Sequence, residues 1–301
     1  MTNREIPVLL IGFNRPELLK KRVHELLREK VSKIIISVDG CPQLRTEMQN
    51  VLTEIRQVCL NQCQVSITLH EVNLGLSKHL TGEISKALMK YHEVIVLEDD
   101  IEISENFLEN MKRGRTILDE MGINGIVSAF SPIKRNRFLP FKNKWRISPY
   151  FNCWGWLCTR EVWESYVLNI SEIDLNSELK SSSTWNQLSK WQQFLWLSRF
   201  IKIQRTPYHT WDIQFQYMCF KKEMTNLSPI FTLTNNEGFD DMRSVHTKGR
   251  KPRWMSNGKV NSELVDQMCV VPISRIFSRV IEPNTTAGDS RLIRIRNTMR
   301  N

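Results

Sequence analysis

The amino-acid sequence predicts a doubly wound α/β fold, in which helices cover both faces of a largely parallel sheet. Short β-branched runs alternate with amphipathic segments through the first 130 residues, which is the pattern of strand, crossover helix and strand. The chain has 301 residues, 41% of them hydrophobic, so it is long enough for one large or two small domains. A disordered chain and a small disulfide-stapled protein are both excluded.

Five short apolar runs are expected to form parallel strands that are buried on both faces. They are Val8–Ile11, Ile34–Val38, Val65–Leu69, Val94–Leu97 and Ile126–Ala129. After the first run, Pro16–Lys30 places leucines at helical spacing, and Leu80, Ile84 and Leu88 repeat every fourth residue before the fourth run. These segments are therefore predicted to be crossover helices.

From Lys134 onward the sequence is rich in tryptophan and loses the strand–helix alternation. Helices are expected at Glu161–Val167, Trp185–Phe200 and Trp211–Lys222. We therefore divide the chain into an α/β half (residues 1–130), a second, helical half of the same domain (131–254) and a basic C-terminal tail (255–301).

The charge balance favours an anionic partner. Lys and Arg number 42 against 32 Asp and Glu, a net charge of +10, which leaves nucleotides, lipid headgroups and nucleic acid open. No apolar run approaches the ~20 residues of a membrane helix, and no signal peptide precedes Ile6–Phe13, so we expect a cytoplasmic protein. The seven cysteines lack zinc-site spacing and are interpreted as reduced thiols.

A ligand of a doubly wound sheet binds beyond the carboxyl ends of the strands. The segments that follow the first four runs are polar, and they are the candidate binding residues: Asn14-Arg15-Pro16, Asp39-Gly40, Asn73-Leu74-Gly75 and Glu98-Asp99-Asp100.

The Glu98-Asp99-Asp100 triplet indicates a metal site. Three clustered carboxylates repel one another when ionised, and a divalent cation relieves that repulsion. Oxygen ligands suit Mg²⁺ or Mn²⁺, which commonly bind through one or two carboxylates plus substrate phosphates. If the strand continued, Glu98 and Asp100 would point one way and Asp99 the other. The alternative is a solvated turn without a ligand.

Arg15 and Asp39 are candidate nucleotide contacts. Arg15 stands just before Pro16, a good first residue for a helix, so it lies at a helix N-terminus suited to a phosphate. Asp39 offers acceptors to a base N–H or a ribose hydroxyl, although an Asp-Gly turn explains it equally well. Gly75 alone makes no dinucleotide fingerprint, and no phosphate-binding loop of the Walker type is present.

Taken together, these motifs resemble those of the nucleotide-diphospho-sugar glycosyltransferases of GT-A fold, and most closely the N-acetylglucosaminyltransferase I type. The likeness extends to about Thr247. It is carried by an ordered set of motifs: Ile11-Gly12-Phe13-Asn14-Arg15-Pro16, Ser37-Val38-Asp39-Gly40-Cys41, Val96-Leu97-Glu98-Asp99-Asp100-Ile101-Glu102, Phe151-Asn152-Cys153-Trp154-Gly155-Trp156-Leu157 with Trp163, and Trp211-Asp212. The resemblance implies a GT-A (Rossmann-like) mixed sheet, with the nucleotide sugar in the first half and the acceptor in the Trp-rich second half.

The resemblance also implies roles for individual residues. Asp100 resembles the metal ligand that bridges to the donor diphosphate, and Glu98 and Asp99 resemble contacts to the donor sugar and ribose. Arg15 and Asp39 occupy the places of nucleotide contacts.

Asp212 falls where such enzymes keep the base that deprotonates the acceptor hydroxyl. The alternative is a helix-stabilising acid in a first turn, with Thr210 as the N-cap.

Three further segments are candidates. Trp156, in Trp154-Gly155-Trp156, is a platform for a sugar face, with core packing as the alternative. The segment Asn235–Thr247 resembles the loop that closes over the donor, so Arg243 and His246 are expected to contact the donor; a loop without function is the alternative. The arginine-rich tail is either solvated or in contact with an anionic membrane.

We therefore expect a metal-dependent, inverting glycosyltransferase of bacterial, cytoplasmic type that uses Mn²⁺ or Mg²⁺. Its donor is expected to be a UDP-sugar and its acceptor a glycan or a lipid-linked saccharide, without nucleic acid as a partner. The rival interpretations are a nucleotidyltransferase on a related sheet and a basic nucleic-acid-binding protein.

Overall fold

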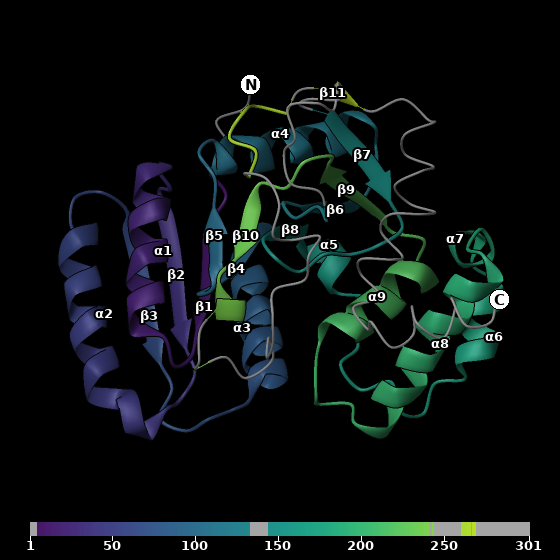
Figure 1. Cartoon of the computed structure of the whole chain (residues 1–301), viewed down its shortest axis with the longest axis horizontal. Helices are drawn as coiled ribbons and strands as arrows, with labels where there is room; N and C mark the ends of the chain where they lie inside the picture. The colour runs from purple at the N-terminus through teal and green to yellow at the C-terminus, as the bar shows by residue number, and fades with distance from the viewer. Residues whose placement is uncertain (1–4, 133–143, 241–242, 244–259, 266, 269–301) are drawn as a thin grey trace.

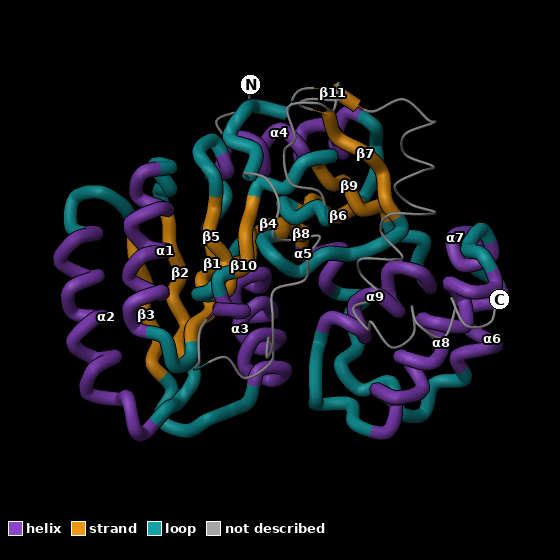
Figure 2. The backbone as a smooth tube through the Cα atoms, in the orientation of Figure 1, coloured by secondary structure: helices purple, strands orange, loops and turns teal. Residues whose placement is uncertain are grey.

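The computed structural model describes residues 5–132, 144–240, 243, 260–265 and 267–268. Within these residues a nine-stranded sheet has the order β11-β7-β9-β6-β8-β4-β1-β2-β3. The strands run through the middle of the molecule between helices (Figures 1 and 2). The predicted doubly wound mixed α/β class is therefore confirmed.

The first four predicted strands are confirmed as a parallel set. They are β1 (Val8–Gly12), β2 (Lys33–Val38), β3 (Gln64–Leu69) and β4 (Glu93–Glu98). β1 pairs in parallel with both β2 and β4, and β2 pairs in parallel with β3. The carboxyl ends of these strands therefore meet at one edge of the sheet.

Three helices connect these strands: α1 (Pro16–Arg28), α2 (Arg45–Cys59) and α3 (Leu76–Lys90). A 3-10 turn at Pro42–Leu44 precedes α2. The helix predicted at Pro16–Lys30 ends slightly early because Lys30 has a φ of 56°, a left-handed conformation that cannot continue a helix.

The fifth predicted strand is β6 (Gly125–Ser128), but β6 does not lie next to β4. β8 (Trp156–Thr159) is inserted between them, antiparallel to both. β9 (Thr225–Pro229), β7 (Lys144–Ser148) and β11 (Gln267–Met268) extend the sheet further. The second half thus contributes strands that its sequence does not predict. β8 and β9, for example, are short and almost fully buried, so they show no period-two alternation.

A second, two-stranded sheet pairs β5 (Ile101–Ile103) with β10 (Thr234–Asn236) in antiparallel register. Only two residues, Asp99 and Asp100, separate the end of β4 from the start of β5, and the chain turns at them. This small sheet brings the segment after β10 next to that turn.

Each face of the main sheet has its own hydrophobic cluster. Val8 and Leu10 of β1 pack with α1, α2 and α4 (Phe107–Glu120), whereas Leu9 and Ile11 pack with α3, α5 (Arg160–Trp163) and α9 (Asp212–Lys221). This alternation along β1 is what a strand with helices on both faces requires.

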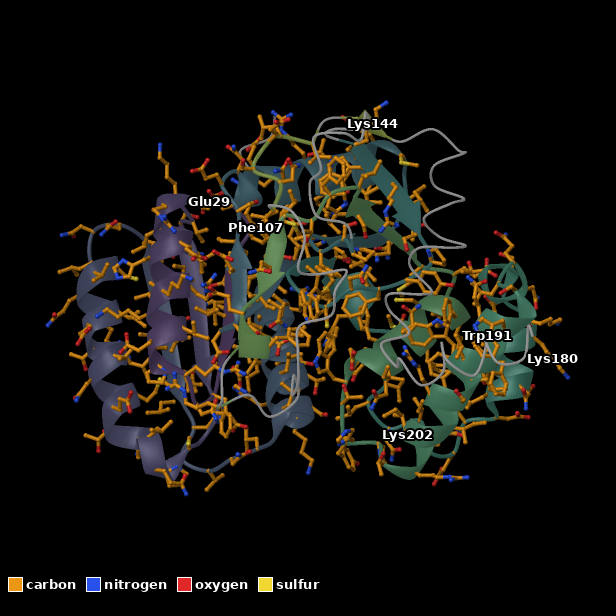
Figure 3. All side chains as sticks on the ribbon, viewed as in Figure 1. Glu29, Phe107, Lys144, Lys180, Trp191 and Lys202 are labelled. Carbon is orange, nitrogen blue, oxygen red and sulfur yellow. The ribbon has the colours of Figure 1, made fainter. Side chains whose placement is uncertain are left out.

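A third cluster lies in the helical part of the second half. It joins α6 (Leu175–Lys180), α7 (Ser183–Asn186), α8 (Lys190–Arg205) and α9. Lys180, Trp191 and Lys202 belong to this part of the molecule (Figure 3), and the two lysines are exposed. No helix within the described residues is long and apolar enough to span a membrane.

The three helices predicted for this half are present with different bounds. The helix expected at Glu161–Val167 is the single turn α5, and that expected at Trp211–Lys222 is α9. The segment Trp185–Phe200 divides into α7 and α8, because Ser189 forms a capping box with Gln192 and so starts a new helix.

Candidate active site

A cavity of about 380 Å³ opens at the carboxyl ends of β1, β2 and β4. The four polar segments that follow the first four strands all contribute to it, as the fold class predicts. The second half adds another wall, made of Cys153, Trp154 and Thr210–Asp212. The cavity therefore combines residues from both halves of the chain.

Glu98, Asp99 and Asp100 all line this cavity. β4 ends at Glu98, so the strand alternation that would have turned Asp99 away does not apply. Burial raises the pKa of Glu98 well above its ordinary value, and the charges of Asp100 and Asp99 raise it further. Burial, with the charge of Asp100, raises the pKa of Asp99 to about 7 against the opposing charge of Arg15. This turn therefore favours a bound cation.

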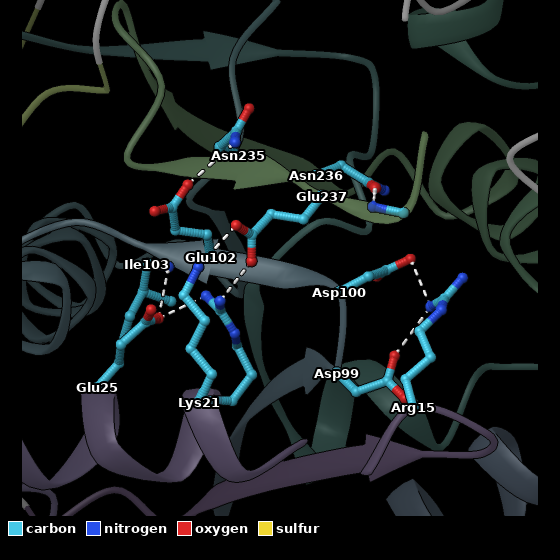
Figure 4. Close-up of polar contacts among 12 residues, drawn as sticks. Arg15, Lys21, Glu25, Asp99, Asp100, Glu102, Ile103, Asn235, Asn236 and Glu237 are labelled. Atoms are coloured by element: carbon cyan, nitrogen blue, oxygen red, sulfur yellow. Dashed lines mark hydrogen bonds and ion pairs between the residues drawn. The ribbon is translucent and has the colours of Figure 1, made fainter. Parts of the chain in front are cut away.

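Arg15 joins the two aspartates of the turn. Its Nη1 donates to Asp99 Oδ1 and to Asp100 Oδ2, both at 3.0 Å, and all three side chains are at most 10% exposed (Figure 4). Asp99 Oδ2 also accepts the N–H of Phe13 at 3.3 Å. Arg15 does lie at the start of α1 and lines the cavity, but its observed partners are the acids of this protein.

Asp39 lines the cavity and also holds a loop in place. Its carboxylate accepts the N–H groups of Gly40, Leu74 and Gly75 at 2.8–3.0 Å. A Cβ on Gly40 would lie 2.3 Å from the backbone of Val72, so only glycine permits this close approach of the loop. The contacts of Asp39 are thus those of a residue that stabilises a turn. Because Asp39 also lines the cavity, it stays a candidate ligand contact.

His79 of α3 is a cavity residue that the sequence does not identify. Its Nε2 lies 2.8 Å from Ser37 Oγ, and the side chain is buried. Burial lowers the pKa of His79 below its ordinary value, which favours the neutral ring. A single histidine on a helix is not a specific sequence signal. Only the position of His79 in the cavity, near Asp39, identifies it as a candidate site residue. Asn73, Cys153 and Trp154, which belong to motifs singled out in the sequence, also line the cavity, as does Asn236.

Asp212 lines the cavity at the first residue of α9. Its Oδ1 accepts a hydrogen bond from the Thr210 hydroxyl. The helix begins with Trp211 as its N-cap and without a side-chain capping bond, so the prediction of Thr210 as the cap is wrong. Gln214 Nε2 donates to the carbonyls of Pro207 and Thr210 at 2.6 and 2.7 Å and so fixes the segment that carries Asp212.

Trp156 does not line the cavity. It is fully buried in β8, stacked on Trp211 at 5.5 Å between ring centroids and packed against Phe151 and Phe215. The prediction of Trp156 as a sugar platform is therefore corrected to core packing. Trp154 lines the cavity instead. It precedes β8 and is separated from Trp156 by Gly155, whose φ of 81° takes the backbone out of the strand conformation.

The candidate loop is described only in part. The Arg243 backbone carbonyl accepts a hydrogen bond from Asn14 Nδ2 at 3.2 Å, which brings this residue near the start of α1. His246, residues 244–251 and nearly all of the basic tail lie outside the described residues, so the predictions for them stay as predictions.

The donor set suits a cation that also takes ligands from its substrate. Within the described part of the chain, no group of three or more His, Cys, Asp or Glu side chains is arranged to hold a metal by itself. Arg15 occupies Oδ2 of Asp100, and coordination through one oxygen requires only the other. Mg²⁺ and Mn²⁺ at one or two carboxylates plus phosphate oxygens fit such a site.

A mixed doubly wound sheet with an acidic turn and a second carboxylate in one cavity fits the glycosyltransferase class that the sequence predicts. Residues 1–168 match the model of the GNT-I family, and the chain belongs to this family of glycosyltransferases.

Among solved structures, one similar chain is the mannosyltransferase PcManGT from Pyrobaculum calidifontis, in complex with GDP-Man and Mn²⁺. It is 11% identical, with a TM-score of 0.44, and the match covers 73% of this chain and 70% of that chain. No curated protein matches the chain.

Proposed function

We propose that this glycosyltransferase moves a sugar from a UDP-sugar to a hydroxyl group of a glycan or lipid-linked saccharide, with inversion at the anomeric carbon. One observation supports this most strongly: the acidic turn Glu98–Asp100 and Asp212 line the same cavity. A nucleotidyltransferase would need a glycine-rich loop after β1, where Ile11–Leu18 contains only Gly12.

Asp100 is the proposed ligand of a Mn²⁺ or Mg²⁺ ion. When bound, the ion supplies positive charge to the diphosphate that leaves with the nucleotide. Arg15 holds Asp100 and Asp99 in place through Nη1, so the carboxylates are oriented before the donor arrives. Such preorganised charge is usually the largest contribution to catalysis.

The other residues that line the cavity are proposed to contact different parts of the donor. Glu98 and Asp99 are proposed contacts to the donor sugar and ribose, and the Asp39–His79 side is proposed to face the nucleotide base. Trp154 offers an aromatic face to a sugar ring. Arg243 and His246 remain predicted contacts to the donor, and the basic tail a predicted contact to the inner face of the membrane.

Asp212 is proposed as the general base. The acceptor hydroxyl gives its proton to Asp212 while its oxygen bonds to the anomeric carbon, and the bond from that carbon to the diphosphate oxygen breaks. The Thr210 hydroxyl bonded to Asp212 Oδ1 orients the carboxylate for this transfer. A positioned base of this kind contributes ~10²–10⁴-fold to the rate.

UDP binding by this protein should depend on a divalent cation. Binding of RNA, the expected ligand under the rival interpretation, would not depend on one. We expect tight binding of UDP in Mn²⁺ and little binding in EDTA, measured by calorimetry. A nucleic-acid-binding protein would instead hold RNA in a filter assay, with affinity that falls steeply with salt. Salt-sensitive RNA binding without Mn²⁺-dependent UDP binding would reject the proposed function.

A further inference from the structure

Two arginines on one face of α1 reach the region around the acidic turn. Arg15 and Arg22 are seven residues apart, about two helical turns. Arg15 binds the carboxylates of Asp99 and Asp100, whereas Arg22 binds Glu25 and Glu237 (Figure 4). The role of Arg15 follows from its contact with Asp99 and Asp100. The contacts of Arg22 with Glu25 and Glu237 have no role in the site described above.

The second group is a buried ionic cluster. The Arg22 side chain is 0% exposed, and its Nη1 and Nη2 donate to Glu25 Oε2 and Glu237 Oε2, each at 2.5 Å. Lys21 Nζ binds the other oxygen of Glu237 at 2.7 Å. A fully buried guanidinium is costly without good partners, so Glu237 is held firmly at the surface of α1.

Both glutamates of this cluster contact the backbone of the turn or of β5, Glu237 through its main chain and Glu25 through its carboxylate. The N–H of Glu237 donates to the carbonyl of Asp100 at 2.8 Å. Glu25 Oε2 accepts the N–H of Ile103 at 3.3 Å, at the far end of β5. Next to Glu237, Asn236 pairs with Ile101 across the small sheet and lines the cavity. The cluster therefore fixes β5 at both ends.

From these contacts we infer that Glu237 is a positioning residue, which with Arg22 holds the backbone of Asp100 so that its carboxylate stays at the cation site. Arg15 fixes the side chain of Asp100, and Glu237 fixes its main chain. This inference rests on the proposed function for its consequence in catalysis, because Asp100 is the proposed metal ligand. Glu237 itself is absent from the residues that line the cavity.

Three variants and one control test the inference. Glu237→Ala removes both ion pairs, and Glu237→Gln keeps the size and one acceptor oxygen but removes the negative charge. Lys21→Met removes only the more exposed partner of Glu237. Lys20→Met, the control, lies on the same helix as Lys21 and breaks a surface pair with Glu54 of α2.

The functional readout is the Mn²⁺ concentration that gives half-maximal UDP binding. We expect it to rise roughly tenfold or more in Glu237→Ala, as for other residues that orient a metal ligand. Glu237→Gln should be intermediate, and both lysine variants should stay within about twofold, since exposed pairs contribute little. A general loss of stability would lower the melting temperature without changing this concentration.

Amide hydrogen exchange of the free protein decides the positioning role independently of any ligand. Exchange in residues 99–103 and 234–238 should be faster in Glu237→Ala than in Lys20→Met. If wild-type protein shows no Mn²⁺-dependent UDP binding, the proposed function fails while this result still stands. Unchanged exchange in these residues would overturn the inference. So would an unchanged Mn²⁺ requirement in folded Glu237→Gln and Glu237→Ala. If Glu237→Ala does not fold, the result for Glu237→Gln alone decides.

Discussion

Replacement of Asp100 by alanine is expected to abolish the Mn²⁺-dependent binding of UDP. The variant removes the proposed ligand and leaves Arg15 with Asp99 alone, so the positive charge of Arg15 is no longer balanced by two acids. Replacing a residue that only orients a metal ligand lowers metal affinity ~10–100-fold. We therefore expect loss of the ligand itself to lower the affinity roughly 100-fold or more. Calorimetric titration with UDP in Mn²⁺ measures the change.

Glu102→Ala is the matched control for this experiment. Glu102 lies two residues further on β5, where its carboxylate accepts a hydrogen bond from Asn235 Nδ2 at 3.0 Å and does not line the cavity. Its UDP affinity should equal that of the wild type. Equal affinities in folded Asp100→Ala and wild-type protein would remove the metal assignment.

Replacement of Asp212 by asparagine is expected to separate binding from transfer. Asparagine has nearly the same shape and can keep the contact with Thr210, but it cannot accept a proton at neutral pH. Donor binding should survive, while transfer should fall by roughly 100-fold or more. Rates of transfer under saturating donor, beside UDP affinities, give both quantities.

Asp174→Ala shows what a helix-stabilising acid does. Asp174 caps α6 by accepting the N–H groups of Asn176 and Ser177 at 3.2 Å, and its loss should cost about 0.5–2 kcal/mol of stability. Transfer by this variant should be unchanged although its melting temperature falls. If Asp212→Asn behaves in the same way, with a lower melting temperature and near-wild-type transfer, Asp212 is not the base.

The parallel half of the fold follows from local sequence. Val8–Ile11 and Val94–Leu97 are apolar runs that must be buried on both faces, and such strands need crossover helices. The position of the site then follows from topology, since the carboxyl ends of parallel strands converge. For the same reason Arg15, Asp39 and the triplet Glu98–Asp100 are predictable as cavity residues.

The rest depends on long-range packing. β8 fits between β4 and β6 because Trp156 completes an aromatic cluster with Trp211 and Phe215, residues far away in sequence. The same packing removes Trp156 from the cavity. Glu237 follows β10, and the pairing of β10 with β5 brings it next to Arg22, so no local pattern predicts their contact.

The most direct test of the central claim is a panel of nucleotide sugars incubated with the wild-type enzyme and Mn²⁺ in the absence of an acceptor. A glycosyltransferase of this kind is expected to hydrolyse its own donor slowly, because water can replace the acceptor hydroxyl beside Asp212. We predict that a UDP-sugar releases UDP, and that EDTA and Asp100→Ala both stop the release. Absence of Mn²⁺-dependent nucleotide release from every sugar nucleotide in the panel, with folded protein, would contradict the account.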